Sequence, residues 1–449
     1  MTQHRTWKEV KILLALGFPI MLTQLAQASM GFVDTLIAGQ YSTLDLAAVA
    51  LGSSIWLPIY LAATGILMAT TPLVAFASGS QTTHGVLSIF RQGLWVALAL
   101  GILSVLILNS TTWILDFMRV EPSLATKTKE YLHAISWGFP ALLLYQLLRS
   151  YFEGLGKTRP AMRIAFLALL LNIPLNYIFV FGKMGFPELG AAGCGWASAL
   201  VMWVMLALGT TAIKRNPQLK LPEETEPCWI DFHALFNYLK LGIPMGFAIL
   251  IETSMFSVIA LLLAPLGTLV VAAHQITMTF SGLIFMIPLS IAMACTIRIG
   301  QLTGAKKPKE AWFSAKAGIL VTTSIALLTS VVIWLLATHI AQIFTTEQYL
   351  IELAASLLLI AALFEISDAL QVTAAGALRG YKDTTIPLVI VFIAYWVIGL
   401  PLGYVLSLTD IILPAMGAAG FWYGLVIGLS VSAILLMIRL RRVAKHACI

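Results

Sequence analysis

Charged residues are scarce in this 449-residue chain, where Asp, Glu, Lys and Arg together make up only 10%. A typical soluble domain is about 25% charged, so a chain of this size lacks the charge to cover a water-facing surface. Hydrophobic residues make up 59%, and the mean hydropathy is +0.92. These values exclude a soluble globular protein, a disordered chain and a coiled coil. They predict an all-α polytopic membrane protein.

Cysteine is also rare, and the sequence lacks the usual enzyme motifs. The four cysteines are scattered without a CxxC pair, so neither a disulfide framework nor a zinc site is indicated. GxSxG, HExxH and a complete phosphate-binding loop are absent from the sequence, which argues against a hydrolase, a metalloprotease or an ATP-driven pump. We therefore expect no enzyme activity and no cofactor.

Twelve apolar stretches meet the length of about 20 residues that a membrane span requires. They lie near residues 11–37, 47–76, 91–115, 128–150, 160–182, 189–213, 238–263, 270–298, 312–338, 348–376, 386–407 and 413–438. Two charge-free stretches, 46–90 and 253–297, are too long for one span. Each must contain a turn, which we place near Ala77–Gly85 and Pro265–Gly267.

The basic residues alternate strongly between the two sides of these spans. One side carries only Arg119, Lys127, Lys129 and Lys183, and the other side carries the remaining 23 of the 27 Lys and Arg residues. By the positive-inside rule, both termini are cytoplasmic. The net charge of +7 therefore marks cytoplasmic loops, and we expect the lipid bilayer as a partner and no nucleic acid.

The two halves of the chain repeat one another. At an offset of 225, Leu16, Gly17 and Pro19 match Leu241, Gly242 and Pro244, and further ordered matches follow. At an offset of 227, Pro174 and Tyr177 match Pro401 and Tyr404, and the Gly-Ala-Ala-Gly run at 190–193 recurs at 417–420. Six spans per half give both halves the same orientation, with a pseudo-two-fold axis along the membrane normal.

This repeat predicts two six-helix lobes. We expect an N-lobe at 1–213, a cytoplasmic linker at 214–237, which contains three prolines, and a C-lobe at 238–449. Two lobes that face one another are a transporter architecture, in which the binding sites lie near the middle of the membrane.

Four acidic residues fall inside expected spans, and no Lys or Arg is expected at comparable depth. They are Asp34 in the first span, Glu252 in the seventh, and Glu365 and Asp368 in the tenth. A charge at the bilayer centre costs about 2.5–3.5 kcal/mol on insertion scales. The structural alternative is that each carboxyl lies near a helix end or is held neutral by hydrogen bonds. An all-acidic interior favours cationic substrates and repels phosphates.

Helical spacing gives these carboxyls polar neighbours. Glu365, Asp368 and Gln371 form one stripe, and Gln27 lies two turns before Asp34 on the same face. Asn172 and Asn176 share a face of the fifth span and can reach a carboxylate on the first, although such pairs also serve to hold helices together.

The halves share a scaffold but not their ionisable groups. Glu252 aligns with Gln27 of the first half, and Asp34 aligns with an isoleucine of the second. Two weaker candidates complete the set. Phe256, one turn after Glu252, can stack on a cation but more often packs as an apolar side chain. His274 is more often a structural group than a proton relay.

These residues together resemble the MATE (multidrug and toxic compound extrusion) family, most closely its NorM-like bacterial branch. The matching segments are Leu16-Gly17-Phe18-Pro19, Asp34, Glu153-Gly154-Leu155-Gly156-Lys157-Thr158, Glu252, Ala272-Ala273-His274-Gln275-Ile276, Asp368 and Arg379-Gly380-Tyr381-Lys382-Asp383-Thr384. The resemblance covers nearly the whole chain. It implies a monomer of the bacterial inner membrane that exports organic cations by multidrug antiport with Na⁺ or H⁺.

The resemblance also implies roles for single residues. Glu252 and Asp368 fall at the cation-coupling carboxylates of the C-lobe, where Na⁺ is a candidate ligand. Asp34, Asn172 and Asn176 fall at the polar site of the N-lobe. Glu365 has no position in the resemblance, and its role is left open.

Two other functions compete with a cation-coupled exporter. The first is a lipid-linked precursor flippase of the same superfamily, which usually has extra spans and a basic cavity, both missing here. The second is an intramembrane enzyme, which is disfavoured because no nucleophile–base or metal-ligand set is present in the sequence.

The charge asymmetry predicts the outcome of labelling with a membrane-impermeant maleimide. In a variant without native cysteines, a single cysteine replacing Lys220 should react weakly from outside intact cells. One that replaces Lys183 should react strongly. The opposite ranking would contradict the predicted topology.

Overall fold

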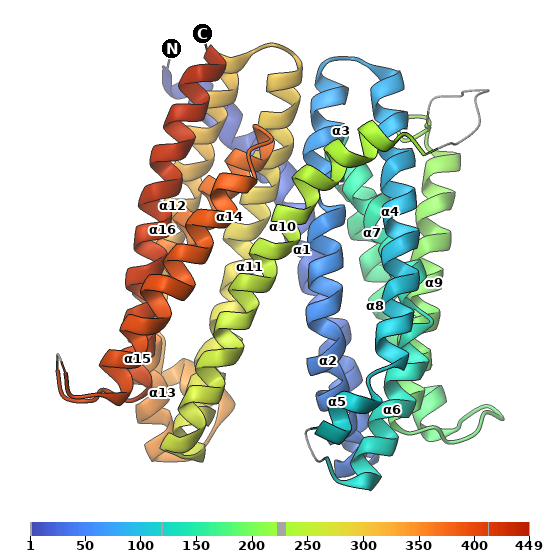
Figure 1. The fold of residues 1–449 in the computed structure, drawn as a ribbon, viewed down its shortest axis with the longest axis vertical. Helices are drawn as coiled ribbons and strands as arrows, with labels where there is room; N and C mark the ends of the chain where they lie inside the picture. The colour runs from blue at the N-terminus through green and yellow to red at the C-terminus, as the bar shows by residue number, and fades with distance from the viewer. Residues whose placement is uncertain (1, 118–119, 222–229, 412, 449) are drawn as a thin grey trace. The chain divides into compact units, whose positions relative to one another are not determined.

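The computed structural model describes residues 2–117, 120–221, 230–411 and 413–448, and the regular structure in these residues is helical throughout (Figure 1). The first half contains α1 (Thr2–Tyr41), α2 (Thr43–Leu67), α3 (Thr70–Gly79), α4 (Thr83–Asn109), α5 (Thr112–Phe117), α6 (Pro122–Ser136), α7 (Phe139–Gly154), α8 (Arg159–Phe181) and α9 (Ala191–Arg215). The second half contains α10 (Phe232–Leu263), η1 (Ala264–Leu266), α11 (Thr268–Gly304), α12 (Pro308–Phe344), α13 (Gln348–Gly380), α14 (Thr385–Phe392), η2 (Ile393–Gly399), α15 (Leu400–Leu408) and α16 (Ala418–Cys448).

Eleven helical stretches of the described residues are long and apolar enough to cross a membrane. They correspond to eleven of the twelve expected spans. The remaining one, near 128–150, is divided into α6 and α7. Pro140 explains this break, because its ring would clash with the carbonyl four residues earlier, at Ser136, where α6 ends.

Both expected turns are confirmed. α3 ends at Gly79 and α4 begins at Thr83, while η1 and Gly267 separate α10 from α11. Parts of the expected topology cannot be described, because Arg119 and residues 222–229 of the expected linker lie outside the described residues.

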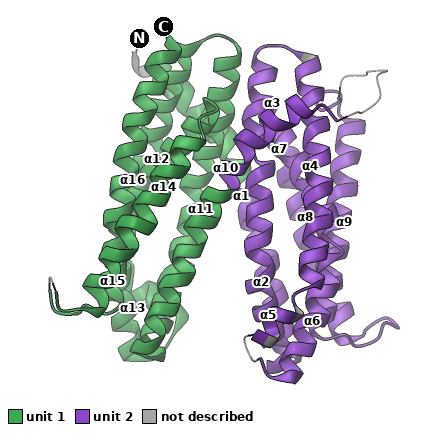
Figure 2. Ribbon diagram, viewed as in Figure 1, with its two compact units in different colours: residues 1–21, 247–449 green, residues 22–246 purple. Residues whose placement is uncertain are grey.

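The chain divides into two compact units (Figure 2). Residues 22–246 form the unit drawn in purple, and residues 1–21 and 247–449 form the unit drawn in green and labelled unit 1 in Figure 2. We call the green unit the second unit, because it contains most of the second half of the chain. α1 and α10 are therefore each divided between the units. In the second unit α13 is central, because it packs against α11, α12 and α16. Three of the four acidic residues expected inside spans belong to this unit.

Glycines bring α15 and α16 into close contact within the second unit. A Cβ atom added to Gly424 would lie 2.5 Å from the Gly403 Cα atom and 2.6 Å from the Gly399 carbonyl oxygen. Gly420 and Gly428 also have no room for a side chain. The spacing of four residues places these glycines on one face of α16. Small residues allow helix backbones in a membrane to approach closely, which gives strong van der Waals packing.

This packing predicts that Gly424→Ala destabilises the protein. The added methyl group meets backbone atoms that cannot move aside, so we expect a loss of about 1–3 kcal/mol, typical of overpacking. Thermal unfolding of the purified protein in detergent measures this loss. Gly282→Ala is the matched control, because a Cβ atom there meets nothing within 4 Å. Equal melting temperatures for the two variants would contradict the close-packing argument.

Candidate functional site

Asp34 lies in a polar cluster inside the unit of residues 22–246. Its side chain is buried, with 8% of the residue exposed. Asn176 and Asn172 of α8 donate hydrogen bonds from their Nδ2 atoms to Asp34 Oδ1 at 2.7 and 3.1 Å. Ser198 of α9 donates from Oγ to Asp34 Oδ2 at 2.8 Å. The predicted contact between the asparagine pair and this carboxylate is confirmed.

Two side-chain oxygen atoms in the cluster around Asp34 make no hydrogen bond to the described residues. The Oδ1 atoms of Asn172 and Asn176 are buried and have no hydrogen-bond partner among the described residues. Each amide can therefore still accept a hydrogen bond while it donates one to Asp34. Ser198 was missed by the sequence analysis, because a serine in a run of small residues carries no distinguishing signal.

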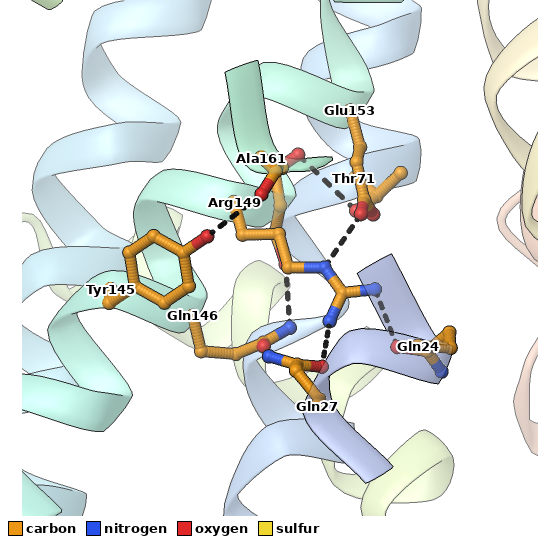
Figure 3. A network of polar contacts seen from close by, with 9 residues as sticks. Gln24, Gln27, Thr71, Tyr145, Gln146, Arg149, Glu153 and Ala161 are labelled. Carbon is orange, nitrogen blue, oxygen red and sulfur yellow. Dashed lines mark hydrogen bonds and ion pairs between the residues drawn. The ribbon is translucent and has the colours of Figure 1, made fainter. Parts of the chain in front are cut away.

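Gln27 does not join this cluster, although the helical spacing suggested that it would. Its Oε1 atom instead accepts a hydrogen bond of 2.8 Å from Arg149 Nη1, and Arg149 Nη2 donates to Gln24 Oε1 at 2.7 Å (Figure 3). Both glutamines lie on α1, and Arg149 lies on α7. The guanidinium therefore ties these two helices together.

The position of Arg149 corrects the sequence analysis, which counted it among the basic residues of the cytoplasmic loops. Arg149 is only 3% exposed. Glu153, one turn later on α7, makes this burial tolerable, because Arg149 Nε donates to Glu153 Oε1 at 2.8 Å (Figure 3). Three of the five guanidinium hydrogens are thus directed at oxygen acceptors, as a buried charge requires.

Glu252 lies in the second unit, near the middle of the membrane-spanning part of α10. Tyr395 donates a hydrogen bond from its hydroxyl to Glu252 Oε1 at 3.1 Å, and the Trp396 indole donates to the Ile251 carbonyl at 3.2 Å. Tyr395 and Trp396 belong to η2, a π-helical segment. π-helical turns are rare and frequently occur at functional sites. The sequence analysis missed Tyr395, because it lies in an uninterrupted apolar run.

The polar stripe predicted on the tenth span is present on α13. Glu365, Asp368 and Gln371 are all buried there. Glu252 and Glu365 are both within electrostatic range of Asp368. Three carboxyl groups on two helices therefore share one electrostatic environment, and Arg379, near the end of α13, is within electrostatic range of Glu252.

Glu365 lines a small cavity between α11, α12 and α13. The cavity has a volume of about 10 Å³, close to the space that one water molecule needs. Its walls are mostly apolar, with Pro288, Thr322 and Thr329 among the lining residues. Glu365 Oε1 has no hydrogen-bond partner within the described part of the chain. Glu365 Oε1 therefore lacks the kind of hydrogen bond that Tyr395 donates to Glu252, although both glutamates are within electrostatic range of Asp368.

His274 and Phe256 belong to an aromatic cluster in the second unit. The Phe256 ring packs edge-on against the Phe364 ring, with 6.4 Å between the ring centres. The Trp422 ring centre lies 5.5 Å from that of Phe364 and 5.9 Å from that of His274. These contacts give both residues a packing role. Cation stacking by Phe256 and a proton-relay role for His274 remain predictions.

A metal site built from protein side chains alone is not evident. Among the residues that the structure describes, no three His, Cys, Asp or Glu side chains are grouped so that they could hold a metal ion. An ion at Glu252 and Asp368 would need hydroxyl, carbonyl or water oxygens to complete its coordination shell.

Comparison with known proteins gives a consistent result. The profile of the MatE family matches residues 19–178 and 244–405. The chain is 45% identical over 441 residues to the multidrug resistance protein MdtK of Photorhabdus laumondii, which covers 98% of this chain and 96% of the relative. It is 43% identical over 442 residues to MdtK of Edwardsiella ictaluri, with the same coverage.

Solved structures share the fold. A multidrug resistance MATE family transporter of the MOP superfamily in an outward-facing conformation matches with a TM-score of 0.88 at 20% identity, covering 98% of this chain and 96% of that chain. The eukaryotic MATE transporter AtDTX14 matches with a TM-score of 0.87 at 19% identity, covering 98% of both chains. These structures confirm the predicted all-helical membrane fold. The family match and the MdtK relatives argue against an intramembrane enzyme.

The ion pair in Figure 3 predicts a large loss of stability in Arg149→Met. This variant leaves Glu153 buried without its cation and the two glutamines of α1 without their donor. Breaking a buried pair from one side costs about 3–5 kcal/mol. The double variant Arg149→Met/Glu153→Gln removes both charges and should recover most of that loss. The melting temperatures of the three proteins in detergent test this. A double variant less stable than Arg149→Met would contradict the argument.

Proposed function

Because this chain belongs to the MatE family, we propose that it is a multidrug antiporter that exports organic cations in exchange for Na⁺ or H⁺. The arrangement of Glu252 and Asp368 is the observation that carries this proposal. Both lie inside membrane-spanning helices, and Glu365 adds a third acidic group. Such costly groups within a membrane generally serve ion or substrate pathways.

We place the coupling ion at Glu252 and Asp368. Two carboxylates on different helices neutralise one desolvated cation better than a single carboxylate can. The Tyr395 hydroxyl donates a hydrogen bond to Glu252, and its oxygen atom can also coordinate an ion. In alternating access, binding of this ion to one state of the carrier would favour that state and release the drug.

Asp34 has a different role in this proposal. Its partners are two amides and one hydroxyl, all neutral. A lone buried carboxylate among neutral groups suits a proton better than a sodium ion, because protonation removes the cost of burying the charge. We propose that Asp34, with Asn172 and Asn176, adjusts substrate release or the conformation of the N-lobe.

The substrates we propose are organic cations, since the expected spans contain four carboxyl groups that attract positive charge. The relatives from Photorhabdus and Edwardsiella are named as multidrug resistance proteins, which supports a broad substrate range. Phe256, next to Glu252, offers an aromatic face for a cation.

The protein is a multi-pass membrane protein, and we propose that it resides in a bacterial inner membrane as a monomer. Both termini and the 214–237 linker would face the cytoplasm, as the distribution of Lys and Arg indicates. The residue ranges proposed for the two lobes that alternate access are 1–213 and 238–449.

Glu252→Gln and Asp368→Asn should each abolish coupled export while leaving folding intact. The amides keep the size and hydrogen bonding of the carboxyl groups but cannot titrate or supply negative charge. Efflux of a fluorescent organic cation from proteoliposomes, driven first by a Na⁺ gradient and then by a pH gradient, measures the effect. Glu130→Gln, at an exposed position of α6, makes the same chemical change away from the site and should export normally.

Wild-type rates in either site variant would remove that carboxylate from the coupling site. Na⁺ binding to the purified variants tests the assignment of roles further, with retention expected in Asp34→Asn and loss in Glu252→Gln. The reverse result would move the metal-ion site to Asp34. If the wild-type protein moved no organic cation under either gradient, the antiporter proposal itself would be wrong.

A further inference from the structure

Two helices of the unit formed by residues 1–21 and 247–449 carry the same pair of side chains near their first turns. On α1, Lys11 follows Trp7 by four residues, and its Nζ atom lies 5.5 Å from the centre of the Trp7 ring. On α12, Lys316 follows Trp312 by four residues, and its Nζ atom lies 5.0 Å from the Trp312 ring centre. In each pair the ammonium group rests on an indole face, at cation–π distance.

A third contact shows that these two pairs are neighbours. The Arg5 guanidinium of α1 lies over the ring of Phe313 of α12, with Cζ 4.9 Å from the ring centre. The beginning of α1 therefore lies beside the beginning of α12, as Figure 1 also shows near the N-terminus. We call Arg5, Trp7, Lys11, Trp312 and Lys316 the basic aromatic patch.

The patch lies where both helices pass from a polar to an apolar environment. Lys11 is the last charged residue before Asp34, and Lys316 is the last before Glu347. Stretches of this length without charge span the hydrocarbon core. The two lysines therefore mark the same membrane boundary, and tryptophan is enriched at this level of a bilayer, beside the headgroups.

Among the described residues, no ion pair neutralises the basic side chains of the patch. Arg5, Lys11 and Lys316 are exposed, and Trp7 is 61% exposed. Lys8 on α1 and Lys306, Lys307 and Lys309 around the turn before α12 are also exposed and add to the positive field. Two acidic residues lie on these helix ends. Glu9 is already neutralised by Arg298, with 2.7 Å between Nε and Oε1. Glu310, in the first turn of α12, is the other one.

We propose that the basic aromatic patch binds the headgroup of an anionic phospholipid. The phosphate would lie among the Arg5, Lys11 and Lys316 side chains, and the acyl chains would continue along the apolar surfaces of α1 and α12. Indole rings that contact the lysines fix their ammonium groups at headgroup depth. A phospholipid fits this surface better than a free phosphate ion, because it offers both a negative group and an apolar chain to a surface that has both characters.

The test uses the full-length protein in detergent, with phosphatidylglycerol, phosphatidylcholine or inorganic phosphate added. The variant Arg5→Gln/Lys11→Gln/Lys316→Gln removes three charges from the patch. The control Arg441→Gln/Arg442→Gln/Lys445→Gln removes three exposed charges from the end of α16. None of these three side chains lies over an aromatic ring of the described residues. Bound lipid is counted by native mass spectrometry, and the affinity for phosphatidylglycerol is measured from its stabilising effect on thermal unfolding.

We expect phosphatidylglycerol to bind the wild-type protein and the control more tightly than phosphatidylcholine does. Each basic residue near an anionic surface contributes about fivefold, so the patch variant should lose about 100-fold in affinity for phosphatidylglycerol. All substituted side chains are exposed, so the lipid-free melting temperatures should stay equal, which shows that folding is intact.

Three results would overturn the proposal. Equal losses in the patch variant and the control would indicate general attraction to positive charge rather than a site. Unchanged affinity in the patch variant would exclude these residues. Stabilisation by inorganic phosphate equal to that by phosphatidylglycerol would indicate an anion site with no lipid specificity.

Discussion

The interior of a membrane protein offers little water to a buried polar group, and this constraint shapes both units of the structure. A charge there must have a partner of its own, since an isolated one costs several kcal/mol. Arg149 meets the requirement with Glu153 and two glutamines, and Asp34 meets it with three neutral donors. Glu365 departs from the rule at one atom, because Oε1 has no hydrogen-bond partner among the described residues, and the residue lines a small cavity.

Much of the fold was accessible from the sequence, because the bilayer dictates the length and the apolar character of each helix. The turns near Gly79 and Gly267 follow from stretches too long for a single span. The contact between Asp34 and the two asparagines was predictable for a related reason. A carboxylate and an amide pair, each inside an apolar helix, can be satisfied most easily by one another.

The remaining features depend on three-dimensional neighbours that helical periodicity does not reveal. Gln27 shares a face with Asp34, yet it bonds Arg149, since a guanidinium from α7 is the stronger donor within reach. Arg149 itself was assigned to a loop because it lies close to the end of an expected span. Its pairing with Glu153 at a spacing of four residues is visible in the sequence and could have indicated burial. Tyr395 carried no such signal, since its hydroxyl is directed at Glu252 by the local π-helical geometry.

That π-helical segment records how the two halves of the chain diverged. Its helix, Thr385–Leu408, has 24 residues, whereas the corresponding α8 of the first half has 23 and is α-helical throughout. Pro160 matches Pro387 and Pro174 matches Pro401 at the same offset of 227, so no residue was gained between them, although the π-helical segment lies in this interval. The two copies therefore wind the same number of residues differently. A π-helical turn holds more residues than an α-helical turn, so it changes the direction of the later side chains relative to the earlier ones. At this offset the position of Tyr395 is Ala168 in the first half, so substitution and a change of winding, without an insertion, are sufficient to explain how only one of the two copies directs a tyrosine hydroxyl at a glutamate.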